Sequence, residues 1–137
     1  NGKTNTEIKE FMQPILDKIS VSAGFVGKEN GRLLFGSDTP SSNAHTNPPG
    51  YNGYLEMKEW FNSGISLEQI LRAATIDNAK AFRLEKQYGS IEEGKKANLL
   101  LLNKNPLKDL SAYDSIDTVI VNGKAFKRTE FSATKNH

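Results

Sequence analysis

The sequence has no cysteine and only two histidines among its 137 residues. The absence of cysteine excludes disulfides, thiolate metal ligands and a cysteine nucleophile. A catalytic zinc ion needs about three protein ligands, which usually include histidine. Because the only histidines are His45 and the last residue, His137, the chain can hardly build a catalytic zinc site by itself.

Strong charge of one sign and long apolar runs are also missing. Lysine and arginine number 18 and aspartate and glutamate 16, a formal net charge of +2. This balance argues against nucleic acid as a partner. The apolar runs are much shorter than the ~18 residues of a membrane span, which argues against a membrane partner. Hydrophobic residues make up 36% of the chain, enough for the core of about one domain.

The first residue is Asn1, and no charged and apolar signal segment follows it. We therefore expect a processed or truncated polypeptide. The localisation stays unknown, because any signal peptide would lie upstream of Asn1.

The first third of the chain predicts a helix and then a buried strand. Apolar residues recur at helical spacing over residues 8–19, behind a possible capping box at residues 4–7. Pro14 interrupts this pattern, so we expect a break there. We expect residues 22–31, which are polar and contain glycine, to form a connection. Residues 32–37 hold an apolar run typical of a parallel strand that is buried on both faces.

The rest of the chain predicts helices and then a small β section. Apolar spacing over residues 54–61 indicates one helix, and a capping box at residues 66–69 begins the next. Residues 97–102 and 118–121 are typical strands, and Asn122-Gly123 is a strong type I′ hairpin signal. A buried strand followed by helices indicates an α/β fold. One such strand cannot form a sheet, so we expect oligomerisation or further strands outside this sequence.

Asp38 is the candidate catalytic residue. It ends the run at residues 32–37 and opens a long loop at residues 39–53, and α/β enzymes place catalytic groups at the carboxyl ends of buried strands. The alternative is that Asp38 only caps the following turn. His45 in the same loop is interpreted as a surface histidine. Nearby, Tyr51, Asn52 and Tyr54 could line a ligand pocket, but Tyr54 fits equally well on the packing face of a helix, and the sequence leaves this open.

Two other patterns are interpreted as structural. Residues 89–96 imitate a phosphate-binding loop, but Lys96 replaces the hydroxyl that binds magnesium, and Glu92 and Glu93 would repel phosphates. We therefore reject nucleotide binding. A basic cluster near the end of the chain is interpreted as a solvated edge; it comprises Lys124, Lys127 and Arg128.

Four linked motifs resemble the metal-dependent amidohydrolase superfamily, and its imidazolonepropionase-like branch in particular. Residues 33–40 resemble its last barrel strand, and residues 64–79 resemble the helices that follow. Residues 89–100 and 119–124 resemble the return into its small β domain and the closing hairpin of that domain. The four motifs occur in the family's order.

The resemblance implies an α/β fold, the C-terminal part of a TIM-barrel amidohydrolase. Residues 1–85 would belong to the (β/α)8 barrel, and residues 86–137 to strands of a composite β-sandwich domain with a polar tail. The reaction implied is hydrolysis of an amide-type carbon–nitrogen bond in a small-molecule substrate, by a water activated by zinc or another divalent metal. Asp38 would contact the metal or its water and carry the proton.

The family's other metal ligands have no counterpart in this sequence. Asn98 stands where many relatives carry aspartate, a difference that concerns packing rather than catalysis. We therefore expect the chain to be inactive alone, to bind no metal tightly, and to associate with the missing N-terminal portion or with itself. The apolar residues of the later helices would then be exposed, including Ile70, Leu71, Ala74 and Phe82. The alternative is a non-catalytic binding or assembly module that kept this part of the fold.

Overall fold

The structure is a computed structural model, and it describes residues 4–38 and 51–131. The described residues fall into two compact units. The first unit is drawn from Asn1–Leu33 and Ser37–Ile70, and the second from Leu34–Gly36 and Leu71–His137. The division at residues 85 and 86 expected from the sequence concerns the domains of a complete enzyme and stays a prediction.

The first long element is α1 (Asn5–Lys28), and it begins at the predicted capping box. The Thr4 N–H donates to the Glu7 carboxylate (2.7 Å), and the Glu7 N–H donates to the Thr4 hydroxyl (3.3 Å). Bonds from the backbone and side chain of Thr4 to the Glu7 carboxylate hold the pKa of that group below its ordinary value. These reciprocal bonds satisfy two N–H groups that a helix start leaves without partners.

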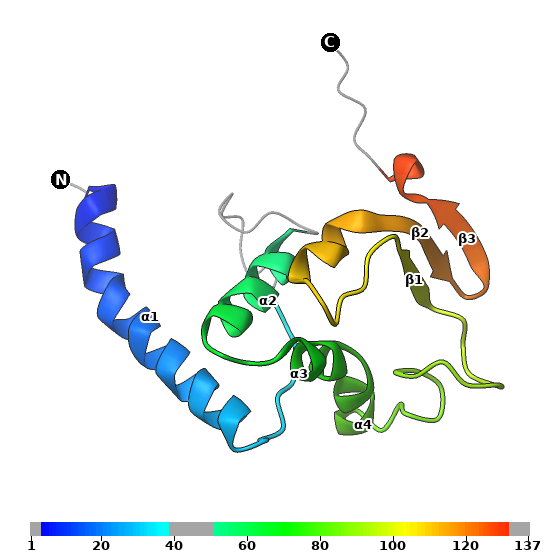
Figure 1. The fold of residues 1–137 in the computed structure, drawn as a ribbon, viewed down its shortest axis with the longest axis horizontal. Coiled ribbons are helices and arrows are strands. Elements are labelled where there is room, and N and C mark those ends of the chain that lie inside the picture. The colour runs from blue at the N-terminus through cyan, green and yellow to red at the C-terminus, as the bar shows by residue number, and fades with distance from the viewer. Residues whose placement is uncertain (1–3, 39–50, 132–137) are drawn as a thin grey trace, which may run out of the picture. The chain divides into compact units, whose positions relative to one another are not determined.

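The expected break at Pro14 is wrong, because α1 continues through it as one helix (Figure 1). A proline inside a helix removes one hydrogen bond. The carbonyl that loses its donor belongs to Glu10, an exposed residue, so water can take the place of the donor. Good helix-forming residues on both sides then carry the helix past Pro14.

The expected connection over residues 22–31 is also wrong, because α1 continues to Lys28. Glu29 is the C-cap, and the chain leaves the helical conformation at Asn30, which has a φ of +52°. The Gly31 N–H donates to the Val26 carbonyl (2.8 Å), and the Asn30 N–H donates to the Gly27 carbonyl (3.1 Å). This pair of bonds is the Schellman ending of a helix.

Glycine in the last turns of α1 allows the helix to approach residues that follow α2 (Asn52–Asn62). A Cβ at Gly24 would lie 2.3 Å from the Ser63 carbonyl oxygen, and one at Gly27 would lie 3.0 Å from the Ile65 Cγ1. The Ser20 and Ser63 hydroxyls are 2.6 Å apart. The polar and glycine-bearing composition that suggested a connection therefore serves close packing within the first unit.

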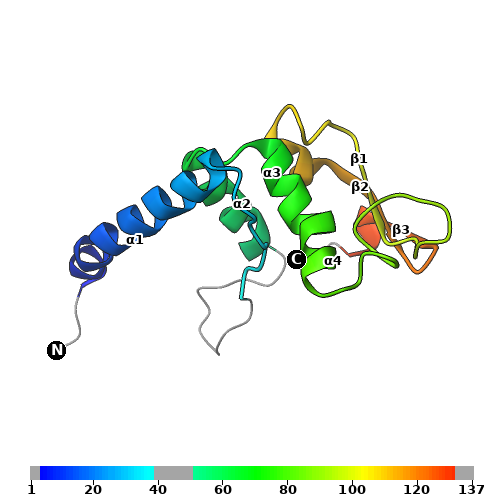
Figure 2. The ribbon, with the colours of Figure 1, turned by 90° about the horizontal axis from the view of Figure 1, so that it is seen from below.

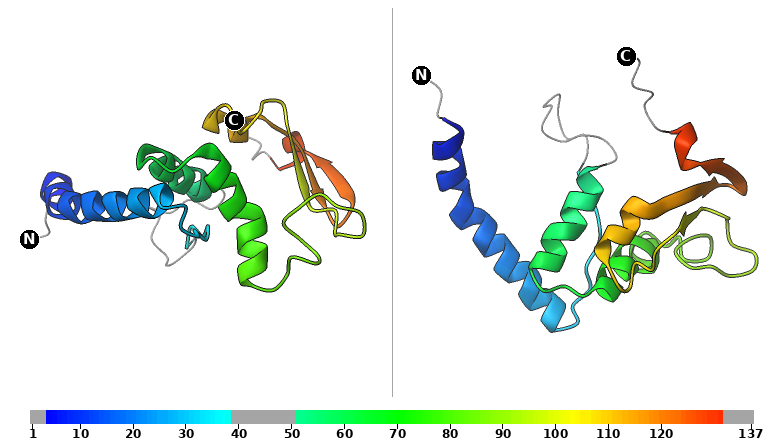
Figure 3. Two further views of the ribbon diagram at one scale, coloured as in Figure 1. Left: turned by 60° about the horizontal axis from the view of Figure 1, so that its bottom comes forward. Right: turned by 45° about the horizontal axis from the view of Figure 1, so that its top comes forward.

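The N-terminal part of α1 is amphipathic, and its apolar side is exposed. Its apolar side chains are between 38% and 62% exposed; they are Ile8, Phe11, Met12, Ile15, Leu16 and Ile19. We call these six residues the α1 stripe. Figure 3 shows this part of the helix extending away from α2.

The segment of residues 32–38 differs from its expectation. No strand pairs with it in the described part of the chain, and its side chains alternate between exposed and half-buried, with Leu34 46% exposed. A strand exists only through hydrogen bonds to a neighbour. Within residues 4–38 and 51–131 the only sheet is formed by later residues, so the predicted burial on both faces is not reached.

The helical run after α2 begins at the predicted capping box, where the Gln69 N–H donates to the Ser66 hydroxyl (3.2 Å). The Ser66 N–H donates in return to the Gln69 side chain (3.0 Å). The run then comprises α3 (Leu67–Arg72), the π-helical η1 (Ala73–Asp77) and α4 (Asn78–Ala81). Figure 2 shows them as one continuous coil. A π-turn inserts one extra residue and so changes the direction of the side chains that follow it.

The C-terminal sheet confirms the predicted strands and hairpin. It has the order β1–β2–β3 and is antiparallel, with β1 at Leu99–Leu102, β2 at Ile116–Val121 and β3 at Lys124–Lys127. Leu99 pairs with Ile120, and Val121 pairs with Lys124. Positive φ angles at Asn122 (+49°) and Gly123 (+80°) fit a type I′ turn. Two 3₁₀ helices flank the sheet, η2 (Leu110–Ser115) and η3 (Arg128–Glu130).

Few large side chains are fully buried. Ile65 and Ile70 are 1% and 0% exposed, whereas Phe82 is 69% exposed. The expected exposure is therefore right for Phe82 and wrong for Ile70. No helix in the described ranges is long and apolar enough to cross a membrane.

Candidate active site

Asp38 is the last described residue before the loop, and its backbone conformation is unusual. Its φ is +47°, and the residue is exposed. A positive φ is uncommon outside glycine, although aspartate adopts it more readily than most residues. The chain therefore turns sharply at Asp38, at the end of the 32–38 segment. The predicted loop residue His45 lies outside the described residues.

Side-chain amides hold the main chain just before Asp38. In the second unit, the Phe35 N–H donates to the Asn78 Oδ1 (3.0 Å), and the Asn78 Nδ2 donates to the Phe35 carbonyl (2.7 Å). In the first unit, the Asn52 Nδ2 donates to the Ser37 carbonyl (2.9 Å). The side-chain amide of Asn52 thus bonds to the main chain of the 32–38 segment. Sequence reasoning considered Asn52 only as a possible pocket residue and gave Asn78 no role.

The tyrosines that flank Asn52 pack against each other. The rings of Tyr51 and Tyr54 have centroids 5.8 Å apart and are tilted by 40°. Such a separation is within the range of favourable aromatic pairs. The contact with Tyr51 gives Tyr54 a packing role at the start of α2, and the pocket stays a prediction.

The described residues do not fit a metal ion by themselves. Within residues 4–38 and 51–131, no three histidine, aspartate or glutamate side chains gather closely enough to hold one. Asp38 can offer one carboxylate, whereas a catalytic zinc ion needs about three protein ligands. Both histidines lie outside the described ranges.

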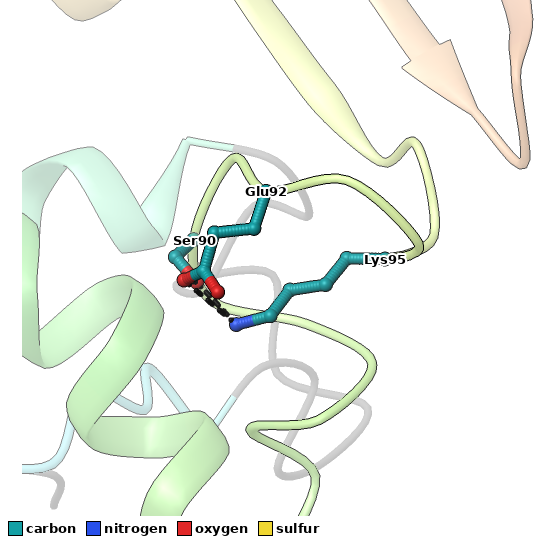
Figure 4. A network of polar contacts seen from close by, with 3 residues as sticks. All are labelled: Ser90, Glu92 and Lys95. Atoms are coloured by element: carbon teal, nitrogen blue, oxygen red, sulfur yellow. Dashed lines mark hydrogen bonds and ion pairs between the residues drawn. The ribbon is translucent and has the colours of Figure 1, made fainter.

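The loop at residues 89–96, for which the sequence led us to reject nucleotide binding, is held together by bonds between its own side chains. Figure 4 shows the Lys95 ammonium directed at Ser90 and Glu92, with the Glu92 carboxylate 3.1 Å away. Bonds from Ser90 and then Lys95 lower the pKa of Glu92. Gly89, with φ +93°, lies so close to the preceding helix that a Cβ would meet the Ile76 Cα at 2.8 Å. The positive charge of Lys95 is thus paired with the carboxylate of Glu92 within the loop.

The basic cluster of Lys124, Lys127 and Arg128 is largely paired within its own unit. The Lys127 ammonium lies 2.7 Å from the Asp117 carboxylate, and Arg128 donates to the Asp114 carbonyl. Bonds from Lys127 and then Thr118 lower the pKa of Asp117. These pairs fit the predicted solvated edge.

Comparisons with known proteins place this geometry in a family. Residues 25–126 match the Amidohydrolase family. A 5-methylthioadenosine/S-adenosylhomocysteine deaminase from Caldanaerobacter subterraneus subsp. tengcongensis is 30% identical over 71% of this chain and 26% of its own length. An imidazolonepropionase from Picrophilus torridus is 44% identical over 34% of this chain and 12% of its own length. The second match confirms the resemblance to imidazolonepropionases.

A solved structure agrees with the sequence matches. A Xaa-Pro dipeptidase with methionine bound in its active site matches 80% of this chain and 25% of its own chain, with a TM-score of 0.67 and 28% identity. The chain thus spans about a quarter or less of the length of each of these three proteins. Because the family match covers well over half of its residues, this chain belongs to the amidohydrolase family.

Proposed function

We propose that residues 1–137 form the C-terminal part of an amidohydrolase that uses water to cleave a carbon–nitrogen bond in a small molecule. In this proposal the 32–38 segment is the last strand of the barrel, and the β1–β2–β3 sheet belongs to the small β domain. The observation that carries the proposal is the family match over residues 25–126, which includes Asp38 and all of the sheet except the last residue of β3. The likeness to the dipeptidase over 80% of the chain supports it.

Asp38 is the residue that we propose for proton transfer. A carboxylate beside the attacking water accepts a proton as the water oxygen bonds to the carbon, and returns it to the nitrogen as the carbon–nitrogen bond breaks. The positive φ of Asp38 supports this role, because uncommon backbone conformations are concentrated at functional sites. The carboxylate ends a segment that two asparagine side chains hold by its main chain.

Enzymes of this family are generally metal-dependent, and we propose that Asp38 contacts the metal ion in the complete enzyme. The described residues contain no cluster of three possible ligands. A metal ion at Asp38 would therefore take its other ligands from parts of the protein outside these residues. We expect no tight metal binding by residues 1–137 alone.

The partner that we propose is the remainder of the amidohydrolase fold. The solved dipeptidase is matched over only 25% of its chain, so three quarters of that fold has no counterpart in these residues. The α1 stripe exposes six apolar side chains on one helix, and such a surface is typical of an interface. The 32–38 segment, for its part, has no strand neighbour in the described ranges.

The proposal is tested by measuring hydrolysis with and without the remainder of the protein. Compounds suggested by the names of the relatives serve as probes: 5-methylthioadenosine, an imidazolone propionate and a Xaa-Pro dipeptide. We expect the full-length polypeptide that contains residues 1–137 to consume at least one probe, and residues 1–137 alone to consume none. Binding of a probe without its consumption would favour a non-catalytic binding module, and turnover by residues 1–137 alone would contradict the proposed incompleteness.

A further inference from the structure

The side chain of Asn78 grips one residue of the 32–38 segment at two points. Its Oδ1 accepts a hydrogen bond from the Phe35 N–H (3.0 Å), and its Nδ2 donates to the Phe35 carbonyl (2.7 Å). The amide thereby imitates the backbone of a neighbouring strand, which offers the same alternation of donor and acceptor. Both groups of Phe35 are satisfied by one side chain that lies 43 residues away in the sequence.

The local helix geometry explains how Asn78 reaches this position. Asn78 is the first residue after the π-helical η1. The hydroxyl of Thr75 donates to the Leu71 carbonyl (2.6 Å) within this widened stretch. Because a π-turn adds one residue to the helix, it rotates every later side chain relative to an unbroken α-helix. Such insertions are frequent at functional sites.

Phe35 lies in a short segment of the second unit that comes from the first third of the chain. That unit includes only three residues from the first seventy, Leu34–Gly36, and Phe35 is the central one. Asp38 follows Phe35 by three residues. The bonds at Phe35 therefore anchor the stretch of main chain that leads to Asp38.

We propose that Asn78 is a positioning residue of the active centre, acting through the main chain of Phe35 on the segment that carries Asp38. This inference rests on the proposed function of Asp38, but the hydrogen-bonded grip can be measured without any activity. Asn78 touches no reacting group in this account. Its contribution to the reaction would come from the geometry of the 32–38 segment alone.

The first experiment measures hydrogen exchange at the Phe35 amide in residues 1–137. Replacing Asn78 with alanine removes the acceptor, and we expect the protection of the Phe35 amide to fall about tenfold, as for the loss of one part-buried hydrogen bond. Asn105→Ala is the matched control, because Asn105 accepts from the Leu107 N–H in a separate turn. Equal Phe35 protection in wild type and Asn78→Ala would overturn the proposal.

The second variant, Asn78→Asp, separates the grip from general packing. Ionised aspartate keeps an acceptor for the Phe35 N–H but turns a second, negative oxygen toward the Phe35 carbonyl. Protonated aspartate supplies an O–H donor there and restores the two-point grip. We therefore expect Phe35 protection, relative to wild type at the same pH, to be low at pH 7 and to recover as the pH falls toward the ordinary aspartate pKa of about 3.9.

The charged neighbours of Asn78 are the same in every variant. The adjacent Asp77 carboxylate lies 3.4 Å from the Arg72 guanidinium, and comparison with wild type at each pH removes its contribution. Asn105→Asp carries the same charge change and should show no recovery at Phe35. If protection in Asn78→Asp did not depend on pH, the two-point grip would be contradicted.

The third measurement joins the grip to the reaction in the full-length polypeptide. We expect Asn78→Ala to lower kcat while leaving KM within about twofold, because a misdirected acid–base group affects the chemical step more than substrate binding. Relative to wild type at the same pH, Asn78→Asp should regain part of kcat at the acidic end of the pH profile. An unchanged kcat in Asn78→Ala would overturn the positioning role. If instead Asp38→Asn left turnover unchanged, the function proposed for Asp38 would fail while the exchange result at Phe35 stood.

Discussion

At the scale of single residues, Gly24 decides how closely α1 approaches the chain after α2. A Cβ at this position would lie 2.3 Å from the Ser63 carbonyl oxygen, well inside any normal contact. In an exposed helix, replacing glycine with alanine would stabilise the fold by about 1 kcal/mol. Here the gain in helix propensity is opposed by a collision with backbone, which cannot move as a side chain can.

We therefore predict that Gly24→Ala destabilises the protein by about 1–3 kcal/mol, the usual cost of overpacking. Urea unfolding measures this free energy. Ser22→Ala is the matched control, because Ser22 lies on the same helix and is exposed. A Gly24→Ala variant as stable as the Ser22→Ala variant would show that α1 does not pack as described.

At the scale of elements, Asn98 holds the hairpin between β2 and β3. Its side-chain oxygen accepts from the Asn122 N–H (2.6 Å), and the Gly123 N–H donates to the neighbouring Ala97 carbonyl (2.9 Å). The sequence motif suggested that this position concerns packing rather than catalysis. In the structure, Asn98 attaches the turn between β2 and β3 to the chain just before β1.

Asn98→Ala should therefore destabilise the sheet by about 1 kcal/mol, the usual net value of a hydrogen bond. Asn98→Asp keeps the acceptor oxygen and should retain most of the stability. Thermal unfolding of the two variants, side by side with wild type, measures the difference. Equal losses in both variants would mean that the bond to Asn122 contributes nothing.

The elements predicted correctly are those with local signals. The capping boxes at Thr4 and Ser66 and the turn at Asn122-Gly123 depend on residues at most three positions apart. Pro14 and Gly24 were misread for the opposite reason. Whether a proline or a glycine ends a helix depends on its surroundings. The solvent exposure of Glu10 allows the helix to continue past Pro14, and Gly24 packs against the backbone of Ser63. Neither fact can be inferred from the neighbouring residues in the sequence.

The candidate site shows the same limit. The position of Asp38 after an apolar run is a local pattern, and it marked this residue as the candidate from the sequence. The grip of Asn78 on Phe35 joins residues 43 positions apart and depends on a π-turn. A π-turn has no characteristic periodicity in the sequence, so the sequence contains no signal that predicts this contact. In the proposed complete fold, the pairing of the 32–38 segment would likewise depend on residues outside this sequence.

At the scale of the whole molecule, the α1 stripe should govern association. Six apolar side chains between 38% and 62% exposed invite contact with another apolar surface. We predict that residues 1–137 alone self-associate, so that light scattering gives a mass above the 15.2 kDa of one chain. Leu16→Lys in the stripe should shift the population toward the monomer, and Ser22→Lys should not. A monomer with a cooperative thermal transition in wild type would contradict this prediction.

The central claim is that these residues supply Asp38 to an amidohydrolase active centre. The most direct measurement is kcat for the full-length polypeptide with Asp38→Asn, compared with the matched charge change Asp17→Asn on the exposed surface of α1. We expect Asp38→Asn to fold normally and to lose about 10²-fold or more in kcat, as for the loss of a positioned acid–base group, with Asp17→Asn unchanged. Turnover of the Asp38→Asn enzyme close to that of wild type would contradict the claim.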